Sequence, residues 1–85
     1  MSSTIKNIIW SQPQCTYCDQ AKALMNRVGI TYEERLIGAG YTKKDLMEAV
    51  PNARSVPQIF MNGEYIGGFR ELKQHLAQTE DNQGK

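Results

Sequence analysis

Hydrophobic residues are grouped in short blocks whose spacing changes along the chain from that of a strand to that of a helix. Between residues 5 and 11 the apolar side chains lie close together ahead of Pro13, which is typical of a short buried strand that runs into a turn. Between residues 16 and 28 they recur three, four and seven positions apart, which predicts a helix with one buried face that Gly29 is suited to end. The apolar residues of this face are Ala21, Leu24, Met25 and Val28.

The middle of the chain predicts a second strand and a second helix. Apolar and charged positions roughly alternate over residues 30–37, which indicates a partly buried strand. A helix connects this strand to the first, so we expect the two strands to be parallel. After the break at residues 38–40, Thr42 and Asp45 have the spacing of a capping box at the start of a helix, and Pro51 ends that helix.

The last third of the chain predicts a hairpin followed by a helix. Asn62 and Gly63 both tolerate positive φ, and they separate two short runs at 58–61 and 64–66, which is typical of a tight turn between antiparallel strands. The glycine pair at 67–68 interrupts the second strand. Apolar residues at positions 69, 72 and 76 then predict a helix, followed by a flexible polar tail over about residues 79–85.

These elements predict an α/β fold in the order β-α-β-α-β-β-α. The economical arrangement is a four-stranded mixed sheet with the three helices on both faces, and we expect right-handed crossovers between the first three strands. The chain has 85 residues, so we expect one domain over residues 1–85 and no separate substrate and cofactor lobes.

Charge and composition narrow the possible partners and compartments. Ten basic and nine acidic residues give a net charge of +1, which provides no broad positive field for nucleic acid. The longest apolar run is three residues, far below the ~18 of a membrane helix, and the first four residues lack the pattern of a signal peptide. We therefore expect a cytoplasmic protein that binds neither nucleic acid nor membranes, and we also expect it to be a monomer.

Cys15-Thr16-Tyr17-Cys18 lies where the first strand meets the first helix, and it is the central chemical signal in the sequence. Disulfide exchange needs one accessible thiolate and one resolving thiol within bonding reach. Cys15 precedes the helix, whose N-terminus stabilises a thiolate, while Cys18 lies on the buried face. The alternatives are a zinc half-site, for which His75 is the obvious third ligand, and two cysteines without chemical function. We predict no metal site.

Two further features are weaker signals when taken alone. Val56-Pro57 precedes a strand, and a cis bond there would expose backbone groups to which an extended peptide could pair; a proline that simply starts a strand is the alternative. The pair Gly67-Gly68 precedes a helix, where close backbone approach could hold a carboxylate, although a turn explains the pair equally well.

Together, these features resemble the glutaredoxin family from Ile5 to about Leu76. The resemblance implies a thioredoxin-like fold and reduction of protein disulfides and glutathione mixed disulfides, with Cys15 as nucleophile, Cys18 as resolving thiol, glutathione as co-substrate and no tightly bound cofactor. The motifs that carry it are Cys15-Thr16-Tyr17-Cys18 with Ala21-Lys22, Ser55-Val56-Pro57-Gln58-Ile59-Phe60, and Ile66-Gly67-Gly68-Phe69. The glutathione contacts that it implies are Tyr17, Arg54, Val56, Pro57, Gly68, Phe69, Arg70 and Glu71.

The sequence departs from the family pattern at three places. Thr16 stands where proline is common, and its N–H is available to the cysteine sulfur. Gln12 stands where a basic residue is common, which makes Arg54 the candidate to bind a glutathione carboxylate. Arg70-Glu71 replaces an acidic pair or Thr-Asp, which leaves Glu71 to receive the glutathione amino group.

Two other functions within this resemblance stay open. In one of them, the position of Arg70 directly after Gly68-Phe69 resembles the glutaredoxin-like redoxins. Such proteins are reduced by a thioredoxin reductase and supply electrons to ribonucleotide reductase. A [2Fe-2S] carrier is the other alternative, in which two chains and two glutathiones hold the cluster through Cys15.

Overall fold

A computed structural model describes residues 6–83, and it describes side-chain surroundings for residues 6–77. The elements follow one another in the predicted order. Ile5, the predicted start of the first strand, lies outside the described residues. The elements are β1 (Ile8–Ser11), α1 (Thr16–Arg27), β2 (Glu33–Leu36), α2 (Lys43–Ala49), β3 (Gln58–Met61), β4 (Glu64–Gly67) and α3 (Phe69–Gln83).

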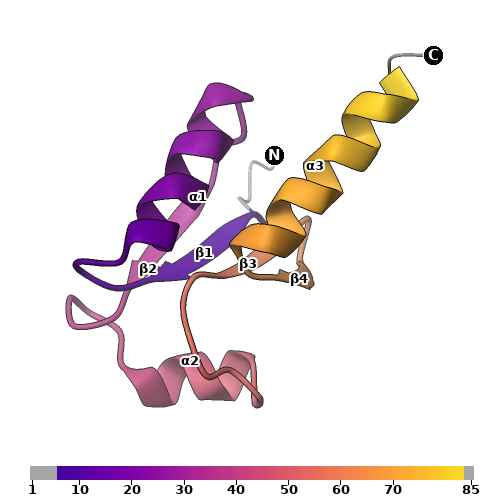
Figure 1. The fold of residues 1–85 in the computed structure, drawn as a ribbon. Helices are drawn as coiled ribbons and strands as arrows, with labels where there is room; N and C mark the ends of the chain where they lie inside the picture. The colour runs from indigo at the N-terminus through magenta and orange to yellow at the C-terminus, as the bar shows by residue number, and fades with distance from the viewer. Residues whose placement is uncertain (1–5, 84–85) are drawn as a thin grey trace, which may run out of the picture.

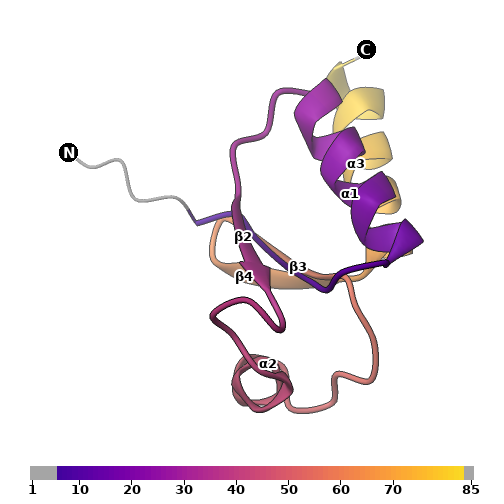
Figure 2. The same ribbon diagram turned by 90° about the vertical axis from the view of Figure 1, so that its left-hand side faces the viewer.

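The four strands form one mixed sheet in the order β2-β1-β3-β4. β1 is parallel to β2, as predicted, whereas β3 is antiparallel to both β1 and β4. α1 and α3 lie side by side on one face of the sheet, and α2 lies on the other (Figures 1 and 2). The four-stranded mixed sheet with helices on both faces is therefore confirmed.

The predicted crossover between the second and third strands is wrong, because β3 runs in the opposite direction. The strand register gives the physical reason. Ser11 pairs with Leu36 at the end of β2, and Trp10 pairs with Gln58 at the start of β3, so the chain leaves β2 and enters β3 at the same end of the sheet. The connection between β2 and β3 therefore does not have to run back along the length of the sheet. Its helix, α2, has only seven residues and a length of ~10 Å.

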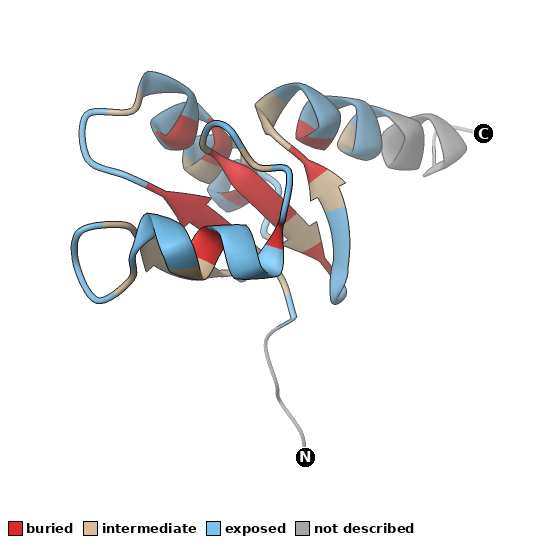
Figure 3. Cartoon of the chain, turned by 90° about the horizontal axis from the view of Figure 1, so that it is seen from below, coloured by how far each residue is buried: buried red, intermediate tan, exposed pale blue. Residues whose placement is uncertain are grey.

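The sheet separates two hydrophobic clusters, because successive side chains of β1 point to opposite faces. Ile9 packs with the helix pair, whereas Trp10 packs with α2. Figure 3 shows the buried residues gathered on the strands and on the helix faces turned toward them. The first cluster is formed by Ile9, Ala21, Met25, Ile59, Met61 and Leu72, and the second by Trp10, Leu46 and Val50.

Local sequence signals account for most element boundaries. Both halves of the predicted capping box are present, since Asp45 N–H donates to the Thr42 hydroxyl and Thr42 N–H donates to the Asp45 carboxylate. Asn62 and Gly63 have φ values of 56° and 82°, as the predicted tight turn requires. α3 continues to Gln83, so the predicted polar tail is helical up to that residue and its last two residues lie outside the described part.

A polar network joins α1 to the edge of the sheet beside the cysteine motif. Lys22 Nζ lies 2.7 Å from Glu34 Oε2, which also accepts a 2.7 Å hydrogen bond from the buried Ser11 hydroxyl. The hydrogen bond from Lys22, followed by that from Ser11, lowers the pKa of Glu34. The same bond raises the pKa of Lys22. This network connects α1, which carries Cys18, to β1 and β2.

The network predicts a pH dependence of folding stability. Because the pKa of Glu34 is lowered on folding, its contribution is present above the unfolded value of ~4.3 and is lost as the pH falls through the folded value. We expect Glu34→Gln to reduce the free energy of unfolding at pH 7 by up to ~1 kcal/mol, an effect that shrinks as the pH is lowered below ~4.3. Urea titrations across this pH range measure it, with the exposed Glu64→Gln as the control. Equal losses at pH 3 and pH 7 would contradict the assignment.

Among the helices of the described part of the chain, none combines the length and apolar character needed to cross a membrane.

Candidate active site

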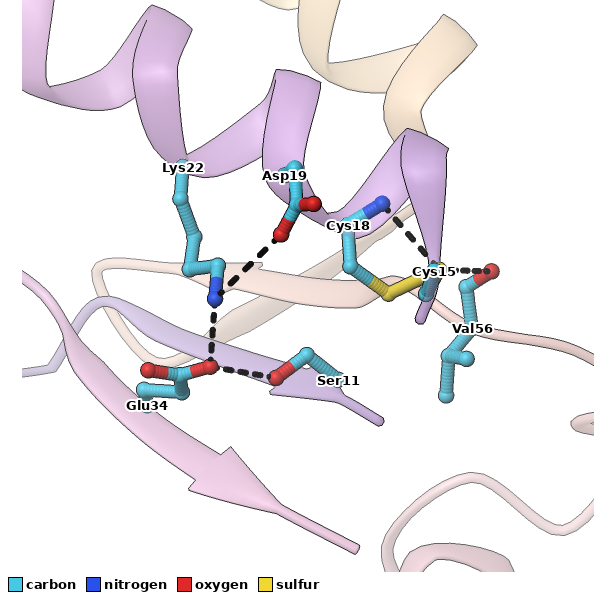
Figure 4. A network of polar contacts seen from close by, with 7 residues as sticks. All are labelled: Ser11, Cys15, Cys18, Asp19, Lys22, Glu34 and Val56. Carbon is cyan, nitrogen blue, oxygen red and sulfur yellow. Dashed lines mark hydrogen bonds and ion pairs between the residues drawn. A yellow bond between two sulfur atoms is a disulfide. The ribbon is translucent and has the colours of Figure 1, made fainter. Parts of the chain in front are cut away.

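The two cysteines lie at the junction of β1 and α1 and are joined by a disulfide bond in this structure. Cys15 is the N-cap residue of α1 and has extended backbone angles, while Cys18 lies in the first turn. The N–H of Cys18 donates to the Cys15 sulfur over 3.1 Å (Figure 4). This donor is Cys18 and not Thr16, whose N–H the sequence suggested. The sulfur of Cys15 is thus placed at the positive end of a helix, which favours a thiolate after reduction.

The two sulfurs differ in exposure, as the helical pattern predicted. Cys18 is fully buried, at 0% exposure, on the same face of α1 as Ala21 and Met25. Cys15 is only partly buried and borders solvent. An external disulfide can therefore reach Cys15 first, and Cys18 can react only with a sulfur that is already bound to Cys15.

The loop before β3 brings a backbone acceptor to the Cys15 sulfur. Cys15 Sγ lies 3.8 Å from the Val56 carbonyl oxygen, across 41 positions of sequence (Figure 4). The bond between Val56 and Pro57 is cis, the first of the two alternatives left open by the sequence. Pro57 is buried and Val56 is partly buried. A ligand joined to Cys15 therefore lies beside the backbone of Val56.

Val56 and Pro57 form one wall of an open groove of about 690 Å³. This volume is within the ~300–1,000 Å³ range of small-molecule sites. Seven of the eight residues predicted to contact glutathione line it, and the additional lining residues are Ser55, Lys73 and Gln74. The seven are Tyr17, Val56, Pro57, Gly68, Phe69, Arg70 and Glu71.

Arg54 is the predicted contact that does not line this groove. It lies with Gln12 in a neighbouring cavity of about 340 Å³, which shares Ser55 and Val56 with the groove. Arg54 thus lies in the cavity that also contains Gln12, the position at which the family pattern led us to expect a basic residue. It can serve only a ligand that extends past Val56.

The glycine pair and Glu71 form a compact arrangement at the start of α3. The Gly68 N–H donates to Glu71 Oε1 over 2.9 Å, so the carboxylate caps the helix from inside the groove. A Cβ on Gly67 would lie 2.7 Å from Glu71 Cγ, and the φ of Gly67 is +122°, so only glycine fits there. A Cβ on Gly68 would lie 3.3 Å from the Pro57 carbonyl oxygen. Small residues therefore allow α3 to approach the loop of Val56 and Pro57.

Aromatic rings connect the cysteine motif to α3. Tyr17 follows the nucleophile candidate by two positions, is 62% exposed, and its ring centre lies 5.9 Å from that of Phe69. Lys73 Nζ lies 5.3 Å from the centre of the Phe69 ring, a cation–π distance. The groove therefore has an apolar floor on this side and a positive charge directly next to it.

Sequence reasoning missed Lys73 and Gln74, although a signal for them was present. They follow Phe69 and Arg70 by four positions, and residues four apart lie on the same face of a helix. Extending the predicted site by one helical turn would have included both. Ser55, by contrast, was part of the motif that contains Val56 and Pro57 but was not predicted as a contact.

The described residues contain no cluster of three or more His, Cys, Asp and Glu side chains that could hold a metal ion. His75, the third zinc ligand considered from the sequence, lies on α3, outside the lining of the groove.

Comparison with known proteins identifies the family to which this arrangement of cysteines, loop and helix belongs. Residues 7–66 match the family model described as Glutaredoxin. The chain belongs to the glutaredoxin family. Glutaredoxin 3 of Escherichia coli strain K12 is 34% identical over 64 residues, which are 75% of this chain and 77% of that protein. The thiol–disulfide oxidoreductase activity of the family is in keeping with the Cys-x-x-Cys motif.

Solved glutaredoxin structures confirm the thioredoxin-like fold. Glutaredoxin 1 from Francisella tularensis, solved with cacodylate, superposes with a TM-score of 0.76 at 27% identity, covering 92% of this chain and 99% of that one. The glutaredoxin of Brucella melitensis gives a TM-score of 0.73 at 28% identity, covering 96% and 89%. The resemblance that the sequence motifs indicated is therefore confirmed.

A second relative is a larger protein. Hybrid peroxiredoxin hyPrx5 of Haemophilus influenzae is 35% identical over 69 residues, which are 81% of this chain but 28% of that protein. The chain thus corresponds to a part of that relative and to most of glutaredoxin 3.

Proposed function

We propose that this glutaredoxin is a glutathione-dependent thiol–disulfide oxidoreductase that reduces protein disulfides and glutathione mixed disulfides. One observation carries the proposal: the partly exposed Cys15 sulfur lies 3.8 Å from the Val56 carbonyl, at the edge of a groove lined by seven of the eight expected contacts. A coupled assay with NADPH, glutathione reductase, glutathione and the glutathione mixed disulfide of a small thiol tests it. Turnover with thioredoxin reductase but none with glutathione would contradict it.

Reduction of a glutathione mixed disulfide needs only Cys15. Its thiolate attacks the glutathione sulfur, the disulfide bond of the substrate breaks, and the other thiol leaves and takes a proton. A second glutathione thiolate then attacks the glutathione bound to Cys15, glutathione disulfide leaves, and the Cys15 thiolate is restored. The incoming glutathione thiolate supplies the electron pair, and it leaves joined to the glutathione that the substrate brought.

Reduction of a protein disulfide uses both cysteines. Cys15 attacks one sulfur of the client, and the other leaves as a thiolate. Cys18, buried in the first turn of α1, then attacks Cys15, which frees the second client thiol and leaves the Cys15–Cys18 disulfide present in this structure. Two glutathione molecules reduce that bond in two exchange steps.

The charges of the groove fit glutathione, which carries two carboxylates and one ammonium group near neutral pH. Arg70 and Lys73 attract carboxylates, and Glu71 is the anionic group that can receive the ammonium. Glu71 already accepts a hydrogen bond from the Gly68 N–H through Oε1, which leaves Oε2 for the ammonium group. Arg54 is the corresponding partner for the glycine carboxylate at the far side of Val56.

The electron donor can be tested at two neighbouring residues of α3. If glutathione is the donor, Glu71→Gln should raise its KM by roughly fivefold, the equivalent of ~1 kcal/mol for a charge-assisted hydrogen bond in an open groove. Glutamine keeps an oxygen for the Gly68 N–H, so the helix cap is retained. Arg70→Asp should leave glutathione kinetics nearly unchanged, because its charge attracts the ligand carboxylate but repels the ammonium.

The second donor, a flavoprotein thioredoxin reductase, is favoured by the exposed position of Arg70 in the groove wall. In that case Arg70 is a docking charge, and Arg70→Asp should slow reduction in a manner that depends on salt. Steady-state kinetics of both variants with both donors separates the two functions. The proposal for glutathione would be overturned if Glu71→Gln left the KM for glutathione unchanged while Arg70→Asp slowed reduction by the reductase.

A further inference from the structure

A second cavity lies between the two helices that cover the same face of the sheet. Its volume is about 440 Å³, and it shares Phe69 and Lys73 with the groove beside Cys15. Figures 1 and 2 both show α1 and α3 running next to each other. We call it the interhelical cavity. Its lining residues are Gln20, Ala23, Leu24, Arg27, Phe69, Lys73, Leu76 and Ala77.

The lining of the interhelical cavity is apolar with a positive rim. Leu24, Phe69 and Leu76 are partly buried and pack against the main hydrophobic cluster. Arg27 and Lys73 are exposed, and among the residues whose surroundings the structure describes, none that lines this cavity carries a carboxylate. Such a surface complements an apolar side chain that is followed by an acidic one.

The interhelical cavity is continuous with the site of chemistry. Phe69 belongs to both cavities and contacts Tyr17, and the cation of Lys73 lies over its ring. A chain bound to Cys15 can therefore pass along the groove and over Phe69 without leaving the protein surface. Glutathione has only three residues, for which the groove and the neighbouring cavity of Arg54 provide the contacts, so the interhelical cavity is left for a longer substrate.

Helix geometry sets the length of such a substrate. Arg27 follows Cys15 by 12 positions, which is ~18 Å along α1 at 1.5 Å per residue. An extended peptide advances ~3.3 Å per residue, so about five or six residues reach from the Cys15 sulfur to the Arg27 side chain. An acidic residue at that spacing from the client cysteine would meet the positive rim.

We propose that the interhelical cavity docks the client segment next to its reactive cysteine, with an apolar residue between Leu24 and Leu76 and an acidic residue beside Arg27 about five positions from the cysteine. This inference rests on the proposed function, because it names the class of protein substrate for the same cysteine. It makes Arg27 a residue that selects protein clients and has no part in the reduction of small glutathione mixed disulfides.

The test begins with binding, which needs no turnover. Two fluorescein-labelled peptides are compared, and in both of them alanine replaces the client cysteine. Both carry leucine four positions after that alanine, and the fifth position is glutamate in one peptide and lysine in the other. We expect the acidic peptide to bind the oxidised protein at least about fivefold more tightly, and we expect this preference to shrink as salt is added. Arg27→Glu should remove or reverse the preference, Arg27→Gln should weaken it, and Lys44→Glu, the same charge change on α2, should preserve it.

Kinetics then separate this inference from the proposed function. With glutathione recycling, peptides that carry an internal disulfide and the same Leu-Glu or Leu-Lys flank should show the same preference in kcat/KM. Arg27→Glu should leave the reduction of a small glutathione mixed disulfide unchanged.

Equal binding of the two peptides, or a preference that survives Arg27→Glu, would overturn the docking proposal even if glutathione turnover is normal. If laurate displaced the labelled peptides and the protein did not discriminate between the two peptides, the docking proposal would also be overturned, and the cavity would be a site for an apolar acid. Loss of glutathione turnover with peptide preference intact would instead contradict the proposed function.

Discussion

Cys15→Ser should reduce thiol transfer to the uncatalysed rate for glutathione mixed disulfides and for protein disulfides alike. A serine hydroxyl does not ionise near neutral pH, even at a helix N-terminus, and it cannot form a disulfide. The other cysteine cannot replace it, because Cys18 has 0% exposure and lies on the buried face of α1. The expected effect is therefore the largest of any single substitution.

The measurement is the coupled assay with both classes of substrate, accompanied by circular dichroism to show that the fold is retained. Thr16→Ser, which alters the adjacent exposed position and keeps both thiols, is the matched control. If the Cys15→Ser protein kept measurable activity with a glutathione mixed disulfide, the nucleophile would have to be another group.

Cys18→Ser should separate the two activities. A second glutathione molecule can still attack the glutathione bound to Cys15 and release it as glutathione disulfide. Reduction of glutathione mixed disulfides should therefore continue at a rate near that of the native protein. Reduction of protein disulfides should fall by at least about tenfold, because the neighbouring thiol that frees the client is missing and a glutathione from solution must replace it.

The same variant should accumulate as a mixed disulfide with a protein client, which non-reducing electrophoresis detects. The introduced hydroxyl is close in size to the thiol of Cys18, so little destabilisation is expected at this buried position. Equal loss of both activities would show that Cys18 is required for the reactive state of Cys15, and the assignment of a resolving role would be wrong.

The sequence was most informative where local chemistry decides the structure. The face of α1, the capping box of Thr42 and Asp45, and the turn at Asn62 and Gly63 all depend on residues close together in the chain, and all three are present. The prediction was wrong for Val28, which was expected on the buried face of the helix but is exposed and caps its C-terminal end. Seven of the eight residues expected to contact glutathione line one groove, because each of them lies in or next to a recognisable motif, and their contact with glutathione stays a prediction.

Long-range geometry was less accessible from the sequence. The direction of β3 depends on the end of the sheet at which the chain returns after α2, which no local pattern specifies. The position of Arg54 depends on the path of the loop past Val56, which separates it from the groove. The bond from the Gly68 N–H to Glu71 arises because α3 begins directly after the glycine pair, and only the structure shows that the carboxylate folds back.

The central claim is that glutathione joins Cys15 while it lies in the groove of Val56 and the start of α3. The most direct test is to treat the Cys18→Ser protein with glutathione disulfide, confirm by mass spectrometry the product carrying glutathione on Cys15, and map backbone amide shifts by NMR. We expect one glutathione per chain, with the largest shifts at Val56, Gly68 and Phe69 and small shifts on α2. A single adduct on Cys15 whose shifts avoid Gly68 and Phe69, or the absence of any adduct, would contradict this account.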